Sequence, residues 1–96
     1  MVTDSTYRFL RVQLEPGMFD NEFTIILSTE GREISSVVPK ENVKIELEPT
    51  QQKQGRGLLR VRVVGSTEGR LLVDLPRPSF TSQPRLKVWD RDLVAP

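Results

Sequence analysis

The chain of 96 residues contains neither cysteine nor histidine. Without cysteine it can form no disulfide and offers no thiolate ligand to a metal. Without histidine it lacks the commonest general base and the commonest metal ligand near neutral pH, which excludes Ser–His and Cys–His nucleophiles and a typical zinc site within the chain. No loop has the Asp-rich pattern of a calcium site. The sequence therefore predicts a protein that is not an enzyme and that holds no metal or cofactor.

Long hydrophobic runs are also missing. The N-terminal stretch MVTDSTYRFLRVQ has neither the basic start nor the apolar run of a secretory signal. No segment approaches the roughly 18 apolar residues that cross a bilayer. We therefore expect a cytoplasmic protein without a membrane partner. With 36% hydrophobic and 28% charged residues, the length suits one domain covering residues 1–96.

Charge of neither sign dominates, since the net charge is +1, but the charges are unevenly divided. Residues 1–48 hold five Lys and Arg against nine Asp and Glu, whereas residues 49–96 hold nine against four. Such a division is typical of a chain with an anionic partner. It also arises when two halves of one fold, or two copies of a chain, neutralise each other.

Apolar and polar residues alternate along most of the chain, which is the period of a half-buried strand. Val43, Ile45 and Leu47, for example, are expected on the inner side of one strand. Clusters of turn-forming residues separate the alternating stretches. The pattern predicts an all-β fold, a small antiparallel barrel or barrel-like sandwich of about six or seven strands. The expected strands cover residues 9–14, 22–27, 33–38, 43–48, 58–65, 70–76 and 85–89.

The pentapeptide STEGR occurs twice, at residues 28–32 and 66–70, each time between two expected strands. A three-residue loop with a left-handed glycine suits this sequence. In the second copy such a loop sets Ser66 opposite Arg70 and Val63 opposite Val73. Arg62 then faces Asp74, and we expect a cross-strand ion pair between them.

The same register in the first hairpin makes it apolar on both faces. Either that hairpin is covered twice, by the chain and by a partner, or its register differs. The first alternative predicts a protein partner or self-association as a homodimer. The expected interface residues in this hairpin are Phe23, Ile25, Ile26, Ile34 and Val38.

A second recurrence follows the hairpins. VVPKENV, at 37–43, and VWDRDLV, at 88–94, both read Val-x-x-basic-acidic-x-Val. An internal duplication of residues 7–43 and 43–94 explains the recurrence. Chance convergence on turn-forming residues explains it as well.

From residue 43 onward, the order of VKIELE, PTQQKQGRG, the second STEGR hairpin, PRPSFTSQP, RLKVW and DRDLVAP resembles the Src-homology-3-like small barrel. That architecture implies a strand, a long loop, a hairpin, a short strand and a closing helical turn. It implies no particular activity, because its members bind proline-rich peptides or nucleic acid, or mediate assembly. The chain lacks the ALYDY-like segment and the paired Trp of the peptide-binding members.

Two groups of residues are candidate contacts. The basic region 53–62, with Lys53, Arg56, Arg60 and Arg62, predicts contact with nucleic acid, two glycines allowing close approach of the backbone. The alternative is a solvated loop and strand face, and no aromatic pair accompanies the region in the sequence. Trp89 is expected either outward beside Arg85 and Lys87, as a partner contact, or turned inward.

The turn at 15–22 places Met18 and Phe19 at its tip, either folded back over a barrel end or in contact with a partner. Together these features predict a non-catalytic protein-interaction or assembly module. The alternative is a nucleic-acid-binding small barrel. No feature of the sequence predicts a small-molecule substrate.

Overall fold

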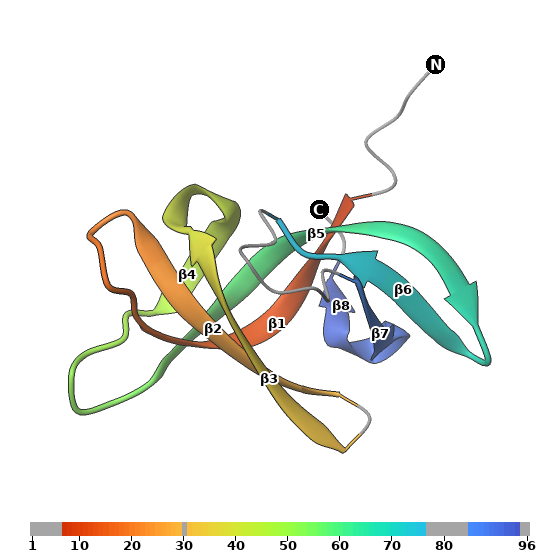
Figure 1. Ribbon diagram of the computed structural model, residues 1–96, viewed down its shortest axis with the longest axis horizontal. Coiled ribbons are helices and arrows are strands. Elements are labelled where there is room, and N and C mark those ends of the chain that lie inside the picture. The colour runs from red at the N-terminus through yellow and green to blue at the C-terminus, as the bar shows by residue number, and fades with distance from the viewer. Residues whose placement is uncertain (1–6, 30, 77–84, 95–96) are drawn as a thin grey trace.

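The computed structural model describes residues 7–29, 31–76 and 85–94, and these form one antiparallel sheet that curls into a half-barrel (Figure 1). Within these residues there is no α-helix, and no helix is long and apolar enough to span a membrane. The predicted all-β class is confirmed. The strands are β1 (Tyr7–Pro16), β2 (Glu22–Thr29), β3 (Arg32–Pro39), β4 (Val43–Leu47), β5 (Gly55–Thr67), β6 (Arg70–Asp74), β7 (Arg85–Trp89) and β8 (Leu93–Val94), and the two 3-10 turns are η2 (Lys40–Asn42) and η3 (Asp90–Asp92).

The sheet is organised around its two long strands, β1 and β5. Its order is β3-β2-β1-β5-β6-β7, with β4 added to β5 and β8 added to β1. β1 and β5 pair over eight positions, from Tyr7 opposite Arg62 to Leu14 opposite Gly55. In Figure 1 the two strands cross the centre of the molecule, and the other elements curl away from them on both sides.

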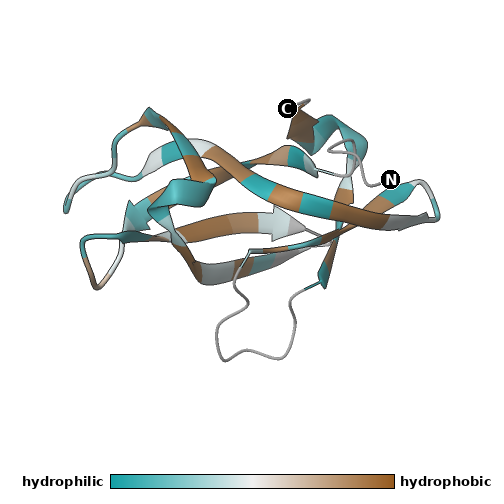
Figure 2. Cartoon of the chain, turned by 90° about the horizontal axis from the view of Figure 1, so that it is seen from above, coloured by the Kyte–Doolittle hydropathy of each residue, from teal (hydrophilic) through white to brown (hydrophobic). Residues whose placement is uncertain are grey.

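Alternation sets which face of the sheet is buried. In β1, Leu10, Val12 and Leu14 are buried whereas the intervening Arg11 and Gln13 are exposed. Figure 2 shows the same alternation of hydrophobic and hydrophilic residues along the strands. Burying these side chains away from water drives the folding of a chain without disulfides. The core consists of Leu10, Val12, Leu14, Phe23, Ile25, Leu27, Val38, Leu59, Val61, Val73, Leu75, Leu86 and Val88.

In the second STEGR hairpin, the residue pairs far from the turn are those predicted, whereas the pairs next to the turn are shifted by one residue. Val63 faces Val73 as predicted, but the register shifts between Val63 and Gly65, so that Thr67 faces Arg70. The loop therefore has two residues, Glu68 and Gly69, with φ of 52° and 79°. The predicted three-residue loop is wrong. Two positive φ values define a turn whose twist matches the twist of the strands, and the bulge accommodates the extra residue.

The first STEGR hairpin also has a two-residue connection, because Thr29 faces Arg32. Relative to the predicted register this shifts the pairing by one residue. Phe23 now faces Val38 on the buried side, and Ile26 faces Ser35 on the other side. The hairpin is thus not apolar on both faces, and the expected alternative, a different register, is confirmed. A shift of one residue moves a whole strand's side chains to the opposite face.

The segments VVPKENV and VWDRDLV take the same local structure. Each contains a 3-10 turn, η2 or η3, whose first residue accepts a hydrogen bond from the backbone N–H of the residue after the turn. A short strand follows each turn: β4 begins with Val43 opposite Leu59, and β8 begins with Leu93 opposite Leu10. Leu10 and Leu59 face each other, so each short strand adds to one member of this central pair. The STEGR turns do not follow this repeat, because the first joins β2 to β3 and the second joins β5 to β6. Duplication of 7–43 and 43–94 stays a prediction.

Two local predictions are wrong. Ile45 and Leu47 were expected to point inward, yet they are 45% and 38% exposed, because β4 lies at an edge and only β5 pairs with it among the described residues. Met18 and Phe19 do not fold back over the sheet, and their side chains are 87% and 67% exposed. The proline-rich stretch 77–84 lies outside the described residues.

Candidate nucleic-acid interface

The outward sides of β1 and β5 form a surface that combines cations with aromatic rings. Tyr7 faces Arg62, Phe9 faces Arg60 and Gln13 faces Arg56. Directly opposite residues of an antiparallel pair point to the same side of the sheet. Their neighbours in sequence are largely core residues, so this side faces solvent. We call this surface the basic–aromatic face and define it by Tyr7, Phe9, Arg11, Lys44, Arg56, Arg60 and Arg62.

Two of its cations lie directly over aromatic rings. The Cζ atom of Arg60 is 4.1 Å from the centroid of the Tyr7 ring, and the Nζ atom of Lys44, on β4, is 4.4 Å from that of Phe9. A cation within about 6 Å of a ring centroid is attracted by the electrons of the ring face. These contacts hold two long, otherwise mobile side chains in place on the surface.

No carboxylate of the described residues is paired with the cations of this surface. Within residues 7–29, 31–76 and 85–94, none of its five cations forms an ion pair. The predicted ion pair of Arg62 with Asp74 is wrong, although the two residues face each other as predicted. Asp74 instead pairs with Arg85 on β7, whose Nε and Nη2 atoms lie 2.8 Å and 3.2 Å from its two carboxylate oxygens.

The Arg85 hydrogen bond lowers the pKa of Asp74 below its ordinary value of 3.8. Desolvation of the carboxyl opposes that shift in pKa, while the charges of Arg85 and, more weakly, of Arg62 add to it. Arg62 therefore acts on Asp74 through its charge, and Arg85 is the residue that donates hydrogen bonds to this carboxylate.

Not every residue of the predicted basic region belongs to this face. Lys53 lies in the turn before β5, where its N–H donates to the Thr50 hydroxyl at 3.1 Å and the Thr50 N–H donates to the Lys53 carbonyl at 2.9 Å. The two glycines of this region, Gly55 and Gly57, were expected to allow close approach of a ligand. Instead they allow close approach of the chain's own backbone. A Cβ atom on Gly57 would lie 2.6 Å from the Lys44 carbonyl oxygen, and one on Gly55 would overlap the Leu47 carbonyl oxygen.

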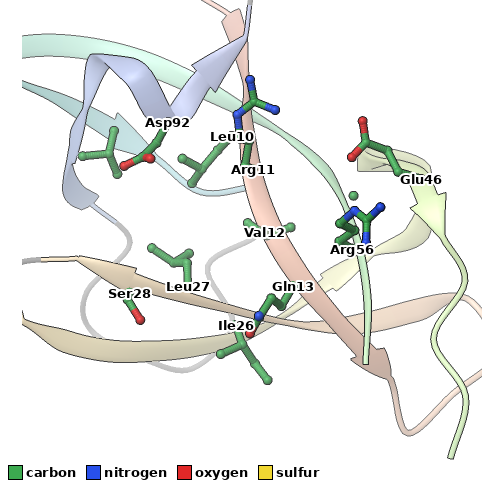
Figure 3. Close-up of a pocket in the computed structure, with 12 residues that line it drawn as sticks. Leu10, Arg11, Val12, Gln13, Ile26, Leu27, Ser28, Glu46, Arg56 and Asp92 are labelled. Atoms are coloured by element: carbon green, nitrogen blue, oxygen red, sulfur yellow. The ribbon is translucent and has the colours of Figure 1, made fainter. Parts of the chain in front are cut away.

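A pocket of about 400 Å³ adjoins the face where one edge of β1 is unpaired. That edge pairs with β8 up to Leu10 and with β2 from Gln13 onward, which leaves Arg11 and Val12 without a neighbouring strand there. Figure 3 shows Glu46 and Arg56 on one side of β1 and Leu27, Ser28 and Asp92 on the other. The charges that line the pocket are mixed in sign, and those of Arg11 and Arg56 continue the basic–aromatic face.

The residues expected at a protein interface are placed differently. Phe23, Ile25 and Val38 are buried in the core of the chain itself, and Ile26 and Ile34 are half-buried. The apolar character on both faces that suggested an interface belongs to a register that the hairpin does not have. The five residues therefore present no common exposed patch on this chain.

Trp89 takes the outward of its two expected positions. Leu86 and Val88 point into the core, and the Trp89 side chain is 39% exposed. The guanidinium carbons of Arg70 and Arg91 lie 4.3 Å and 5.4 Å from its ring centroid. Trp89 is thus held between two cations on β6 and η3.

Sequence reasoning missed Tyr7, Phe9, Arg11 and Lys44. The signal for the first three was present, because inward Leu10 and Val12 place Tyr7, Phe9 and Arg11 together on the outer side of β1. What was lacking was the pairing of β1 with β5, which brings them beside the arginines. The described residues contain no cluster of acidic side chains suited to a metal ion.

Comparison with known proteins gives no match, whether with family models, with curated proteins or with solved structures.

Proposed function

We propose that the chain is a non-catalytic binding module, a small barrel of the Src-homology-3-like kind, that binds single-stranded nucleic acid through its basic–aromatic face. The observation that carries the proposal is the set of five cations that share one sheet face with two aromatic rings and form no ion pair among the described residues. Keeping unpaired cations together costs electrostatic free energy unless an anion binds them.

The order of elements supports the Src-homology-3-like assignment. β5 and β6 form a hairpin, β7 follows, and the 3-10 turn η3 leads into β8, which pairs with β1. Together with β4 and the loop before β5, this order supports the resemblance over residues 43–94, with β1, β2 and β3 as additional strands before it. Barrels of this kind carry many functions, so the site and not the fold supports nucleic acid as the ligand.

The spacing of the arginines favours a linear polyanion. Arg60 and Arg62 lie two residues apart on β5, and Arg56 lies four residues before Arg60 on the same outward side. Alternate residues of a strand are about 6.6–6.8 Å apart. A row of cations along one strand suits a chain of phosphates better than one compact anion.

The aromatic rings favour a single strand over a duplex. Bases of an unpaired strand are free to stack on aromatic side chains and on arginine planes, and such stacking tolerates any sequence. Tyr7 and Phe9, with Arg60 and Lys44 placed over their rings, provide two such platforms beside the cationic row. In a duplex the bases are already stacked on one another, and only its phosphates would use this face.

Self-association of the chain is a second candidate function. The exposure of Ile45 and Leu47 on the edge strand β4 favours it, because apolar side chains on an unpaired edge lower the cost of adding another strand.

Fluorescence anisotropy with labelled mixed-sequence DNA and RNA oligonucleotides at low salt tests the proposal. We expect binding that weakens linearly in log affinity against log salt, as counterion release requires. Arg60→Glu is expected to weaken binding by about tenfold or more and to reduce the salt slope, because it reverses a charge at the centre of the face. Tyr7→Leu is expected to weaken binding with an unchanged salt slope, since stacking involves no counterion.

Lys53→Glu is the matched control, because it makes the same change of charge in the turn outside the row. We expect it to weaken binding by less than about threefold. Equal effects of Arg60→Glu and Lys53→Glu would show attraction to net charge without a defined face. A lack of binding at tens of micromolar protein would remove the proposed function. Circular dichroism of each variant confirms that it is folded.

A further inference from the structure

β4 is an edge strand whose side chains are almost all exposed. It pairs with β5 on one side, and no described strand pairs with its other side. Lys44, Ile45, Glu46 and Leu47 are exposed, and only Val43 is half-buried. An unpaired strand edge offers a row of backbone donors and acceptors to another strand.

The charges along β4 are self-complementary. Lys44 and Glu46 stand one residue on either side of Ile45, with opposite signs. We propose that β4 pairs antiparallel with β4 of a second copy of this chain, with Ile45 facing its own counterpart on the twofold axis. Lys44 of each copy then faces Glu46 of the other, and this pairing would draw the Lys44 ammonium away from the Phe9 ring over which it lies in the single chain.

This register is the one that the charges select. Moving the second copy by two residues in one direction sets Lys44 opposite Lys44, and moving it by two in the other sets Glu46 opposite Glu46. Moving it by one residue sets charged side chains opposite apolar ones. Like charges directly opposite each other destabilise a pair of strands, whereas opposite charges stabilise it.

The pairing of β4 with β5 contains a bulge that bears on the proposal. Pairing passes from Ile45 opposite Gly57 to Leu47 opposite Arg56, so Glu46 has no partner residue in β5. Bulges at sheet edges often discourage further pairing. Here the residue without a partner in β5 is the one that provides the carboxylate for the second copy, and Ile45 and Leu47 remain exposed on either side of it.

The dimer would join two sheets into one. An antiparallel pair related by a twofold axis perpendicular to the sheet keeps corresponding faces of both copies on the same side. The basic–aromatic faces of the two copies would then lie side by side, with Lys44 of each copy close to the junction. The pairing of β4 deepens the second candidate function, self-association, and does not depend on the binding of nucleic acid, because it rests on the edge strand alone.

Charge reversal tests the pairing, with molar mass in solution as the readout. At about 100 μM we expect light scattering after size exclusion to give twice the monomer mass of 11.0 kDa. Lys44→Glu alone and Glu46→Lys alone are each expected to give monomers, because every pair at the junction then joins like charges. The double variant Lys44→Glu with Glu46→Lys is expected to form dimers again.

Mixing the two single variants gives the sharpest outcome. One carries only negative and the other only positive charge at these positions, so we expect them to form a heterodimer at a one-to-one ratio. Glu33→Lys, which makes the same change of charge as Glu46→Lys on a different edge strand, β3, is the control and should remain dimeric.

A wild-type protein that is monomeric at this concentration would overturn the proposal. So would a dimer that persists in both single variants, or a mixture of the two variants that stays monomeric. None of these results depends on nucleic acid, so failure of the dimer and failure of the proposed function are distinguishable.

Discussion

The ion-pair partner of Asp74 depends on which strands lie beside β6 in the sheet. It has an arginine directly opposite on each side, Arg62 on β5 and Arg85 on β7. The local pattern identified Arg62, because β5 and β6 are joined by a short turn. It could not identify Arg85, which lies 11 residues after Asp74 in the chain and forms the hydrogen bonds.

The lowered pKa of Asp74 predicts a pH dependence of stability at acid pH. A carboxyl with a lower pKa in the folded than in the unfolded state stabilises the fold above its unfolded pKa, near 3.8, and loses this contribution as the pH falls through its folded pKa. Asp74→Asn should therefore be less stable than wild type at pH 7. The difference should shrink below about pH 4. Urea unfolding at both pH values measures this.

Asp20→Asn is the control for this measurement, because it removes an exposed carboxyl in the turn between β1 and β2. We expect its stability to follow that of wild type at both pH values. If Asp74→Asn and wild type differ equally at pH 7 and in acid, the ion pair with Arg85 does not contribute to stability through the charge of Asp74.

Among the strands, β4 and β5 show why a glycine in a strand is informative. Gly57 lies where β4 comes close to β5, with the Lys44 carbonyl oxygen 2.6 Å from the position that a Cβ atom would take. The sequence showed the glycine but not its neighbour, so it was interpreted as room for a ligand. Glycine within a strand often marks the close approach of another backbone, and here that backbone is the chain's own.

Gly57→Ala and Gly65→Ala form a matched pair on the same strand. At Gly57 the added Cβ would lie 2.6 Å from backbone and 3.1 Å from Leu14 Cδ1, and we expect a loss of about 1–3 kcal/mol in the free energy of unfolding. At Gly65 the nearest atom, Leu72 Cδ1, would be 3.6 Å away. Gly65→Ala should be neutral or slightly stabilising, because alanine restricts the unfolded chain more than glycine does.

Thermal or urea denaturation of the two variants measures the difference. Equal stabilities of Gly57→Ala and Gly65→Ala would contradict the close approach of the β4 backbone to Gly57 of β5. A loss of stability confined to Gly57→Ala would agree with it.

The hairpins show where local patterns are sufficient and where they are not. Alternation placed Val63 and Val73 on one side correctly, because it depends only on the period of a strand. Alternation could not determine the loop length of the second STEGR turn, because a two-residue turn with a bulge and a three-residue turn give the same distant pairs. For β4, alternation predicted inward side chains, but no other part of the sheet covers that edge.

At the scale of the whole molecule, the pairing of β1 with β5 could not be predicted from the sequence pattern. Alternation determines which side of a strand is buried but not which distant strand lies next to it. The arginines of β5 were therefore identified as candidate contacts, while Tyr7 and Phe9, some 50 residues earlier in the chain, were not. Only the assembled sheet brings these side chains together.

The sharing of strands between the halves predicts a single unfolding transition. If the chain is divided between residues 48 and 49, β4 lies in the first half and pairs with β5 of the second, whereas β8 lies in the second half and pairs with β1 of the first. Loss of either half removes a neighbour from the other. Far-ultraviolet circular dichroism, which reports on all strands, and fluorescence of Trp89, which reports on β7, should give coincident denaturation curves.

Separate midpoints for the two signals would mean that one half unfolds without the other. That outcome would contradict the dependence of each long strand on the short strand that the opposite half provides.

Because β4 pairs with β5 and β8 pairs with β1, neither half of the chain contains all the neighbours of its own strands. A fragment that ends after Leu47 keeps β4 but loses β5, to which β4 adds, while its own β1 loses β8. Each copy of such a fragment would therefore have an unpaired β4 and a β1 that has lost both β5 and β8. A fragment made by cutting the chain at its midpoint is therefore expected to associate with a second copy of itself, because association can cover the strand edges that the cut exposes.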